Sequence, residues 1–578
     1  MLNQSILSKI FFFLLLSVVS SATQLKAQDT FQEIYYDYLR GETTRLQTIE
    51  TMVHYLEHDH HEHDIIKCLT PLIILMENEQ QETNTSNPLF LKNAPNKTEF
   101  FTNEYISPTE KFRINYDTLG QHKVPLDDLN GNAIPDYVEK VAEAADSSYN
   151  HEIITLGFTD PIPERAVYDI FVRDMQYYGV TNNSTVGIFP CNNLASGTCI
   201  YIENDFVGFP DNDDPEGQQI GAIKVTMAHE FKHAIQFAQN NWQGDSNRWA
   251  EMDATLMEEV VYDDVNDYYN YIGGFSTDLF SSPNSSLTAG SYEDVTWALY
   301  FHERFGQKFW PDVWKIIESD KQIPLIGAIE TELQSRSESY HAAVLESYMW
   351  HFTSGDFASI NYGFDEAFEY PDPSITKTIT ELQQELTDTL SLNPFAARYY
   401  LVDLSELRPP PFGYVKLNFG TTSSDIHIGL LGYLKNESIK TQTALETATD
   451  SRGSIKTSWA WEDIQKVGMV VMNSHPNEEG TYSYQFTEYF PEQIQLAQNF
   501  PNPFNPQTTI QVANPVNQVV TLNIYDLLGR YIQTVYEGSL EVGVKNFVVD
   551  GSALASGIYV YRLESKNSVK TKMMTLIK

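Results

Sequence analysis

The sequence is poor in basic residues, in cysteine and in long apolar runs. It has 37 lysines and arginines against 78 aspartates and glutamates among 578 residues, which gives a formal net charge of −41. Nucleic-acid phosphates and anionic membrane surfaces repel so acidic a chain, and this excludes both as expected partners. The acidity is typical of a protein that stays soluble in a salty or extracellular medium.

The one long apolar run lies at the start of the chain. Lys9 is followed by apolar residues from Ile10 to Val19, and small residues then lead to Ala27. A basic start, a short apolar core and a small residue at the cleavage point predict a secretory signal peptide, cut after Ala27 or, as the second choice, after Ala22. The run is too short to span a membrane, so no transmembrane segment is expected in the mature chain.

Only three cysteines occur, Cys68, Cys191 and Cys199. In an exported chain, the short spacing of the last two predicts a disulfide that closes the loop PCNNLASGTC, with two free thiols as the alternative. Cys68 is then left over. Few cysteines also speak against a structural zinc site, which more often takes cysteine ligands.

A metal-binding motif stands in the stretch VTMAHEFKHAIQFAQ, where His229, Glu230 and His233 follow the order H-E-x-x-H. Residues four apart lie on one face of a helix, so the two imidazoles can share one metal ion. Glu230 lies beside them and can take a proton from water. The apolar residues around the trio predict a buried helix: Val225, Met227, Ala228, Phe231, Ala234, Ile235 and Phe237.

The residues after His233 select the kind of site. A three-histidine site needs a glycine and a third histidine where this chain has Gln236 and Gln239, so that class is excluded. The helix-like stretch RWAEMDATLMEE offers Glu251 as the third ligand, with Glu258 on the same face as the second choice. Two neutral imidazoles and one carboxylate leave a fourth position for water, as in catalytic zinc sites.

This ligand set predicts peptide hydrolysis. Zinc would activate the water, and Glu230 would act as the general base and pass the proton to the leaving amine. The donor to the oxyanion stays open among several residues of the same domain: Tyr262, Tyr268, Tyr269, Tyr271 and His302. No G-x-S-x-G elbow or phosphate loop competes with this interpretation.

An acidic loop ahead of the motif has the ligand spacing of an EF-hand-like calcium loop. Side-chain oxygens fall at positions 1, 3, 5, 9 and 12, which are Asp128, Asn130, Asn132, Asp136 and Glu139. Position 7, Ile134, offers its backbone carbonyl. Ala133 stands at position 6, where such loops usually have glycine. The alternative is an Asn/Gly turn that caps the following helix.

The segment before this domain is predicted to be a helical propeptide with a linker. It contains the tract HDHHEHD, residues 58–64, which could bind metal, although a solvated hinge is the favoured interpretation. The segment also contains Cys68, a candidate latency thiol, because a propeptide thiolate can occupy the open position of a catalytic zinc. Its surroundings resemble the C-G-T switch of some secreted metalloproteases, except that Leu69 stands where they have glycine.

The pieces FRINYDTLG, DLNGNAIPDYVE, IENDF, AHEFKHAIQFA, RWAEMDATLMEEVVYDDVNDY and WALYFHERFG, across about residues 112–306, resemble a family of secreted bacterial zinc metalloproteases. The resemblance implies that His229, His233 and Glu251 are zinc ligands and that Glu230 is catalytic. The chain departs from the family pattern at Met252-Asp253, where small residues are more usual.

The C-terminal part has the alternating pattern of β-strands. The elements FPNPFNP, IYDLLGR and LASGIYVYRL and the basic end of the chain resemble a type A sorting domain of the type IX secretion system. The resemblance implies that the type IX machinery is a partner and that the protein is secreted or attached to the outer cell surface.

Together these patterns predict a multidomain protein with an α+β zincin-like catalytic domain followed by two Ig-like β-sandwich modules. The expected parts are a signal peptide (1–27), a helical propeptide and linker (28–97), the metalloprotease domain (98–390), a β-sandwich (391–490) and the sorting domain (493–578). We expect a secreted zinc-dependent endopeptidase that acts on proteins or peptides and is stabilised by calcium. The alternative is a cell-surface binding or adhesion protein on an inactive zincin scaffold; the intact motif and the downstream glutamate favour the enzyme.

Overall fold

The computed structural model describes residues 31–58, 66–83, 101–183, 191, 196–273, 278–383, 385–407, 413–445, 451–490 and 493–578. The predicted signal peptide lies outside the described residues, and so does the His-rich tract beyond His58. Within the described residues, no helix is both long and apolar enough to cross a membrane. The chain divides into two compact units: residues 1–270, 288–298 and 307–328 form the first, and residues 271–287, 299–306 and 329–578 form the second.

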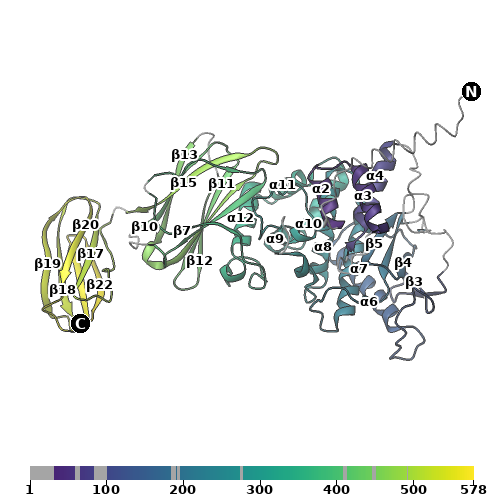
Figure 1. The fold of residues 1–578 in the computed structure, drawn as a ribbon, viewed down its shortest axis with the longest axis horizontal. Coiled ribbons are helices and arrows are strands. Elements are labelled where there is room, and N and C mark those ends of the chain that lie inside the picture. Colours follow the sequence, from purple (N-terminus) through teal and green to yellow (C-terminus); the bar gives the residue numbers. More distant parts are fainter. Residues whose placement is uncertain are drawn as a thin grey trace, which may run out of the picture. The chain divides into compact units, whose positions relative to one another are not determined.

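A six-stranded mixed sheet organises the first unit (Figure 1). Its strands follow the order β1 (Ile66–Cys68), β5 (Tyr177–Asn183), β6 (Thr198–Glu203), β4 (Tyr168–Arg173), β3 (Phe112–Tyr116) and β2 (Asn103–Ile106). Strands β3, β4 and β6 are parallel, and β5 runs antiparallel to β6. Strands β5 and β6 are buried along their whole length, as expected for strands covered on both faces.

The helices of this unit are α2 (Phe31–Leu39), α3 (Arg45–His58), α4 (Thr70–Thr83), α6 (Asp136–Tyr149), α7 (Gln218–Asn240), α8 (Ala250–Val261) and α10 (Phe309–Ser319). Shorter helical turns are η1 (Asn150–Leu156) and η2 (Asp245–Trp249). The long helix α7 packs against α6, α8, β5 and β6. It ends at Asn240 and is capped by Asn241, which adopts a left-handed conformation (φ 57°) and donates its N–H to the Phe237 carbonyl. This sharp end lets the chain turn back into α8.

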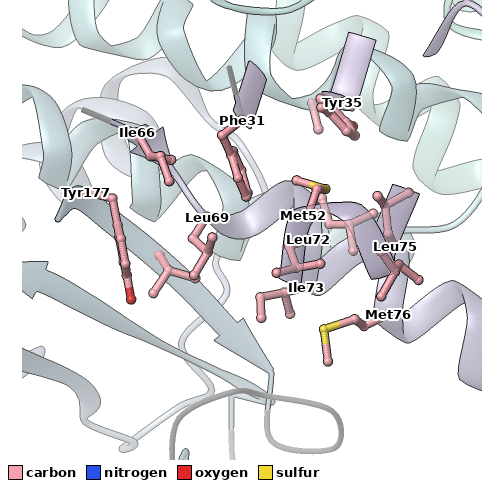
Figure 2. Packing of buried hydrophobic residues seen from close by; sticks show 14 of the residues in the cluster. Phe31, Tyr35, Met52, Ile66, Leu69, Leu72, Ile73, Leu75, Met76 and Tyr177 are labelled. Carbon is pink, nitrogen blue, oxygen red and sulfur yellow. The ribbon is translucent and has the colours of Figure 1, made fainter. Parts of the chain in front are cut away.

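The N-terminal segment of residues 31–83 shares a hydrophobic core with the sheet (Figure 2). Side chains of α2, α3, β1 and α4 pack in this cluster with Tyr177, Val180 and Tyr201 of the sheet. The segment was expected to be helical, and it also contributes strand β1, which pairs in parallel with β5. We call residues 31–83 the prosegment from here on; the name marks these residues and assigns no role to them.

The second unit contains two pairs of sheets. In the first pair, the order β13-β10-β15-β8 faces the order β12-β11-β14-β9-β7 across one core. These strands are β7 (Ile375–Ile379), β8 (Leu390–Leu392), β9 (Ala396–Asp403), β10 (Tyr414–Thr421), β11 (Ile426–Leu434), β12 (Ile439–Ala444), β13 (Ser451–Ala460), β14 (Ile464–Asn473) and β15 (Gly480–Tyr489). Strand β7 lies before residue 391, and β8 begins at Leu390.

The second pair of sheets has the orders β16-β17-β20 and β19-β18-β21-β22 around another core. Its strands are β16 (Gln495–Leu496), β17 (Gln507–Asn514), β18 (Gln518–Asp526), β19 (Tyr531–Leu540), β20 (Gly543–Asp550), β21 (Gly557–Ser565) and β22 (Ser568–Leu576). Helices α9 (Val295–Phe305), α11 (Leu325–Ser335) and α12 (Tyr340–Phe352) lie earlier in the chain. The described part of the protein is thus multidomain, with a helical N-terminal region and several β-sheets.

Candidate metal centre

Helices α7 and α8 bring together three of the predicted metal ligands. His229 and His233 lie one turn apart on α7, with 3.2 Å between their Nε2 atoms. Glu251, in the first turn of α8, places its carboxylate 3.4 Å from His229 Nε2 and 3.1 Å from His233 Nε2. All three side chains are buried. The sequence spacing between the helices therefore corresponds to a close approach in space.

Cys68, at the end of β1, completes this group. Its Sγ atom lies 3.6 Å from His233 Nε2, and one ligand atom from each of the four residues lies within 4.8 Å of the others. The structure thus brings the unpaired cysteine of the prosegment to the H-E-x-x-H motif. We call Cys68, His229, His233 and Glu251 the metal cluster.

The separations within the metal cluster fit a tetrahedral zinc site. Zinc bonds of about 2.05 Å to nitrogen or oxygen and about 2.3 Å to sulfur give edges of about 3.3 Å between two light atoms and about 3.6 Å between nitrogen and sulfur. Four of the six separations are 3.1, 3.2, 3.4 and 3.6 Å, where the two from Glu251 start from different carboxylate oxygens, and one ligand atom of each residue lies within 4.8 Å of the others. Both carboxylate oxygens of Glu251 are buried, and they face the two imidazole Nε2 atoms and no other hydrogen-bond donor among the described residues. Buried carboxylate oxygens placed in this way are expected where a cation binds.

The charges of the metal cluster also favour a cation. Burial, and then the charges of Glu230 and Glu251, raise the pKa of the Cys68 thiol, so a thiolate there needs a nearby positive charge. Burial lowers the pKa of His229, but Glu251 and Glu258 together raise it to about 10. A metal ion at this position must displace a proton from His229, so metal affinity is expected to rise with pH.

Neighbouring side chains fix both imidazole rings. Glu258, the second choice for a ligand, lies outside the metal cluster and instead pairs through Oε1 with His229 Nδ1 at 2.7 Å. Gln236 Oε1 lies 2.8 Å from His233 Nδ1, and its amide donates to Asp253 Oδ2 (2.8 Å). Partners of this kind set the tautomer and orientation of a metal-binding histidine. In the sequence, Gln236 served only to exclude a three-histidine site, which has glycine at this position. Its role as the partner of His233 did not follow from the sequence.

Glu230 is buried beside the metal cluster and held by hydroxyl groups. Its Oε2 accepts hydrogen bonds from Thr181 (2.7 Å) and from Thr70 of the prosegment (3.1 Å). Gly179 of β5 makes room for it, because a Cβ atom there would lie 2.7 Å from Glu230 Cγ. Thr181, Thr70 and Gly179 could not be recognised from the sequence, because they come from strand β5 and helix α4, far from the motif along the chain.

The predicted calcium loop, residues 128–139, forms a closed turn that runs into the first turn of α6. Asp128 accepts hydrogen bonds from the N–H groups of Gly131 (2.7 Å) and Ala133 (2.9 Å), while Asn130 and Asn132 donate their amides to Glu139 (2.8 and 2.7 Å). Asp136 accepts from Leu129 N–H, and Ile134 donates its N–H to Asn132. Ala133 takes the left-handed conformation (φ 68°) that glycine usually supplies at this position. The structure therefore gathers the predicted ligands in one loop.

Two further sequence predictions concern cysteines and aromatic residues. The disulfide between Cys191 and Cys199 is confirmed. Of the candidate oxyanion donors, Tyr262 gives its hydroxyl hydrogen to the Ala144 carbonyl (3.0 Å). Tyr292, which the sequence did not single out, has its ring 6.0 Å from the ring of His229.

Comparison with known proteins identifies the end of the chain. Residues 498–578 match the family described as "Secretion system C-terminal sorting domain". These residues cover β17 to β22 and confirm the predicted type IX sorting domain. The protein is secreted or lies on the outer cell surface, and the type IX secretion machinery is its partner in export.

Comparisons with curated sequences and with solved structures identify no further family. A search of curated protein sequences finds no match. Among solved structures, similarity is found to a β-1,2-glucanase from Parabacteroides distasonis (8% identity, 33% of this chain and 32% of that chain, TM-score 0.13) and to the adhesin domain of Epf from Streptococcus pyogenes (10% identity, 33% and 73%, TM-score 0.13). The chain thus spans about a third of the first of these proteins. TM-scores of this size do not establish a shared fold.

Proposed function

We propose that this protein is a secreted zinc-dependent endopeptidase that hydrolyses peptide bonds in protein or peptide substrates. Its first unit would be a zincin-like catalytic domain, and the two pairs of sheets would be Ig-like sandwich modules. One observation carries the proposal. The ligand atoms of His229, His233 and Glu251 lie 3.1 to 3.4 Å apart, close to the edge length of a tetrahedral zinc site, and Glu230 lies beside them. The family resemblance of residues 112–306 points to the same activity.

His229, His233 and Glu251 would hold the zinc ion. Zinc, when bound, supplies a Lewis acid that activates a water molecule and polarises the scissile carbonyl. Glu230 takes up the proton as the general base and delivers it to the leaving amine. Thr181 holds Oε2 of Glu230, which fixes the plane of the carboxylate and leaves Oε1 for proton transfer. Glu258 and Gln236 keep the two imidazoles in the orientation that presents Nε2.

The prosegment would keep the enzyme latent. Cys68 takes the fourth position of the metal cluster, which a catalytic site leaves open for water. Thr70 adds a hydrogen bond to the general base Glu230. Strand β1 covers the edge of β5, where an extended peptide would otherwise add to the sheet. Activation then requires the prosegment to leave, after which water and substrate can enter.

A calcium ion would stabilise the catalytic domain at the loop from Asp128 to Glu139. In the structure, the carboxylate oxygens of Asp128 and Glu139 accept hydrogen bonds from within the loop. Calcium prefers six to eight oxygen ligands, and this loop offers carboxylates, amide oxygens and the Ile134 carbonyl in the EF-hand order. The loop leads directly into α6, so its order fixes the start of that helix.

Metal analysis together with proteolysis tests the proposal. The full-length secreted protein should contain one zinc per chain. After a thiol reagent has displaced Cys68, it should hydrolyse a general protein substrate, lose this activity with a chelator and regain it with zinc. One zinc per chain without any turnover after Cys68 has been displaced would contradict the proposal.

A further inference from the structure

The prosegment places a buried lysine directly beside the metal cluster. Lys67 precedes Cys68, and its side chain is only 3% exposed. Its Nζ atom lies 2.7 Å from Glu258 Oε2 and forms a second, short ion pair with Asp267. Both carboxylates are buried as well. A buried charge is costly unless it is paired, so this pocket is built around a cation.

The aromatic ring of Tyr178 completes the pocket. Lys67 Nζ lies 5.0 Å from the centre of this ring, within the range of a cation–π interaction. The Tyr178 hydroxyl donates to Asp267 Oδ1 (3.1 Å), which orients the carboxylate toward the ammonium group. Glu258, Asp267 and Tyr178 all belong to the first unit outside the prosegment. None of the three departs with the prosegment, and we call them the cation pocket.

The prosegment follows the path on which an extended substrate would bind. Ile66 and Cys68 pair with Tyr177 and Gly179 of β5, and Leu69 N–H donates to the Gly179 carbonyl (3.2 Å). Strand β1 is the last strand of the sheet, so its departure exposes β5 as an edge to which a peptide can add. Cys68 marks the position of the reacting centre, and the cation pocket lies one residue away.

We propose that the cation pocket receives a basic side chain, lysine foremost, of the substrate residue next to the scissile bond. The inference rests on the proposed peptidase function and names its substrate class. An apolar side chain would leave Glu258 and Asp267 buried without a cation, and an acidic one would add a third negative charge. Lys67 thus acts as an internal mimic of the substrate.

Labelling of Cys68 tests the pocket without any catalysis. Cys68 is the single cysteine outside the disulfide, so a thiol reagent applied to the zinc-loaded full-length chain reports when the prosegment opens. Lys67→Met should accelerate labelling by about 100-fold, because a buried ion pair loses one partner. Lys67→Arg should remain within about tenfold of the native rate. Arg40→Met, which removes an exposed ion pair of the same prosegment, is the matched control and should change little. Equal labelling rates for Lys67→Met and Arg40→Met would overturn the proposal.

Peptide hydrolysis tests the substrate class. The full-length chain with Lys67→Met and Cys68→Ala is assayed with peptides that differ only in lysine, arginine, norleucine or glutamate beside the scissile bond. We expect kcat/KM for lysine to exceed that for norleucine by about 100-fold. Asp267→Asn should reduce this ratio at least tenfold, and Asp264→Asn, an exposed neighbour with the same charge change, should leave it unchanged. Equal hydrolysis of all peptides overturns the inference alone, whereas hydrolysis of none overturns the proposed function and the inference together.

Discussion

The docking of the prosegment depends on buried side chains that share one hydrophobic core with the sheet. Leu72 of α4 has no exposed surface and packs in the core that joins the prosegment to the sheet (Figure 2). Truncation of such a leucine to alanine costs about 2–5 kcal/mol, because transfer energy is lost and a cavity remains. If the prosegment opens as a unit, this cost falls on the opening equilibrium. Leu72→Ala should then raise the open population by about 30- to 5,000-fold.

The labelling rate of Cys68 measures that population. When closing is faster than the reaction with the thiol reagent, the observed rate is proportional to the open fraction. Leu56→Ala is the matched control, since Leu56 lies in the same prosegment but is 39% exposed. Thermal unfolding of both variants shows whether the rest of the chain is intact. A labelling rate for Leu72→Ala that equals the rate for Leu56→Ala would refute the reasoning that the prosegment is held by this core.

Three further predictions concern the metal cluster, the calcium loop and a buried acid. Glu258→Gln weakens the partner of His229 and should lower zinc affinity by about 10- to 100-fold, measured by competition with a chelator; an unchanged affinity would contradict the orienting role. Calcium should raise the melting temperature of the full chain, and Asp128→Asn should reduce that increase; no response of the native chain to calcium would count against the site. Burial raises the pKa of Glu203 to about 8, although the N–H groups of Met175 and Asn204 lower it. The folded state binds this proton more tightly than the unfolded state. The contribution of Glu203 to the free energy of unfolding should therefore be fully present below about pH 4.5 and be lost as pH rises to about 8. Glu203→Gln should flatten this decline in melting temperature between pH 5 and 8, and an equally steep decline would show that another group titrates.

The sequence predicted best those features that depend on neighbours along the chain. The spacing of His229 and His233 fixes their common helix face, and the structure places them as that geometry requires. Likewise, the short separation of Cys191 and Cys199 made their disulfide predictable. The motifs FPNPFNP, IYDLLGR and LASGIYVYRL resemble a type IX sorting domain, which the family comparison confirms.

Features that depend on distant pairing escaped prediction. Strand β1 has only three residues, and it becomes a strand because β5, more than 100 residues later, offers an open edge. Lys67 is an ordinary lysine in the sequence, and only the fold brings Glu258 and Asp267 to it. Glu258 itself was ranked as a possible ligand because helix periodicity shows which face it shares but not its distance from the metal cluster. The role of Gly179 depends on the close approach of Glu230, which no local pattern reveals.

The most direct test of the central claim is the rate of proteolysis by a Glu230→Gln variant that still binds zinc. The change is made in the full-length chain that carries Cys68→Ala and Lys67→Met, and Glu143→Gln on the exposed face of α6 is the matched control. We predict that Glu230→Gln keeps one zinc per chain and loses at least about 100-fold in kcat, because the general base is gone, while Glu143→Gln retains full activity. Proteolysis that is equally fast in both variants would contradict the account.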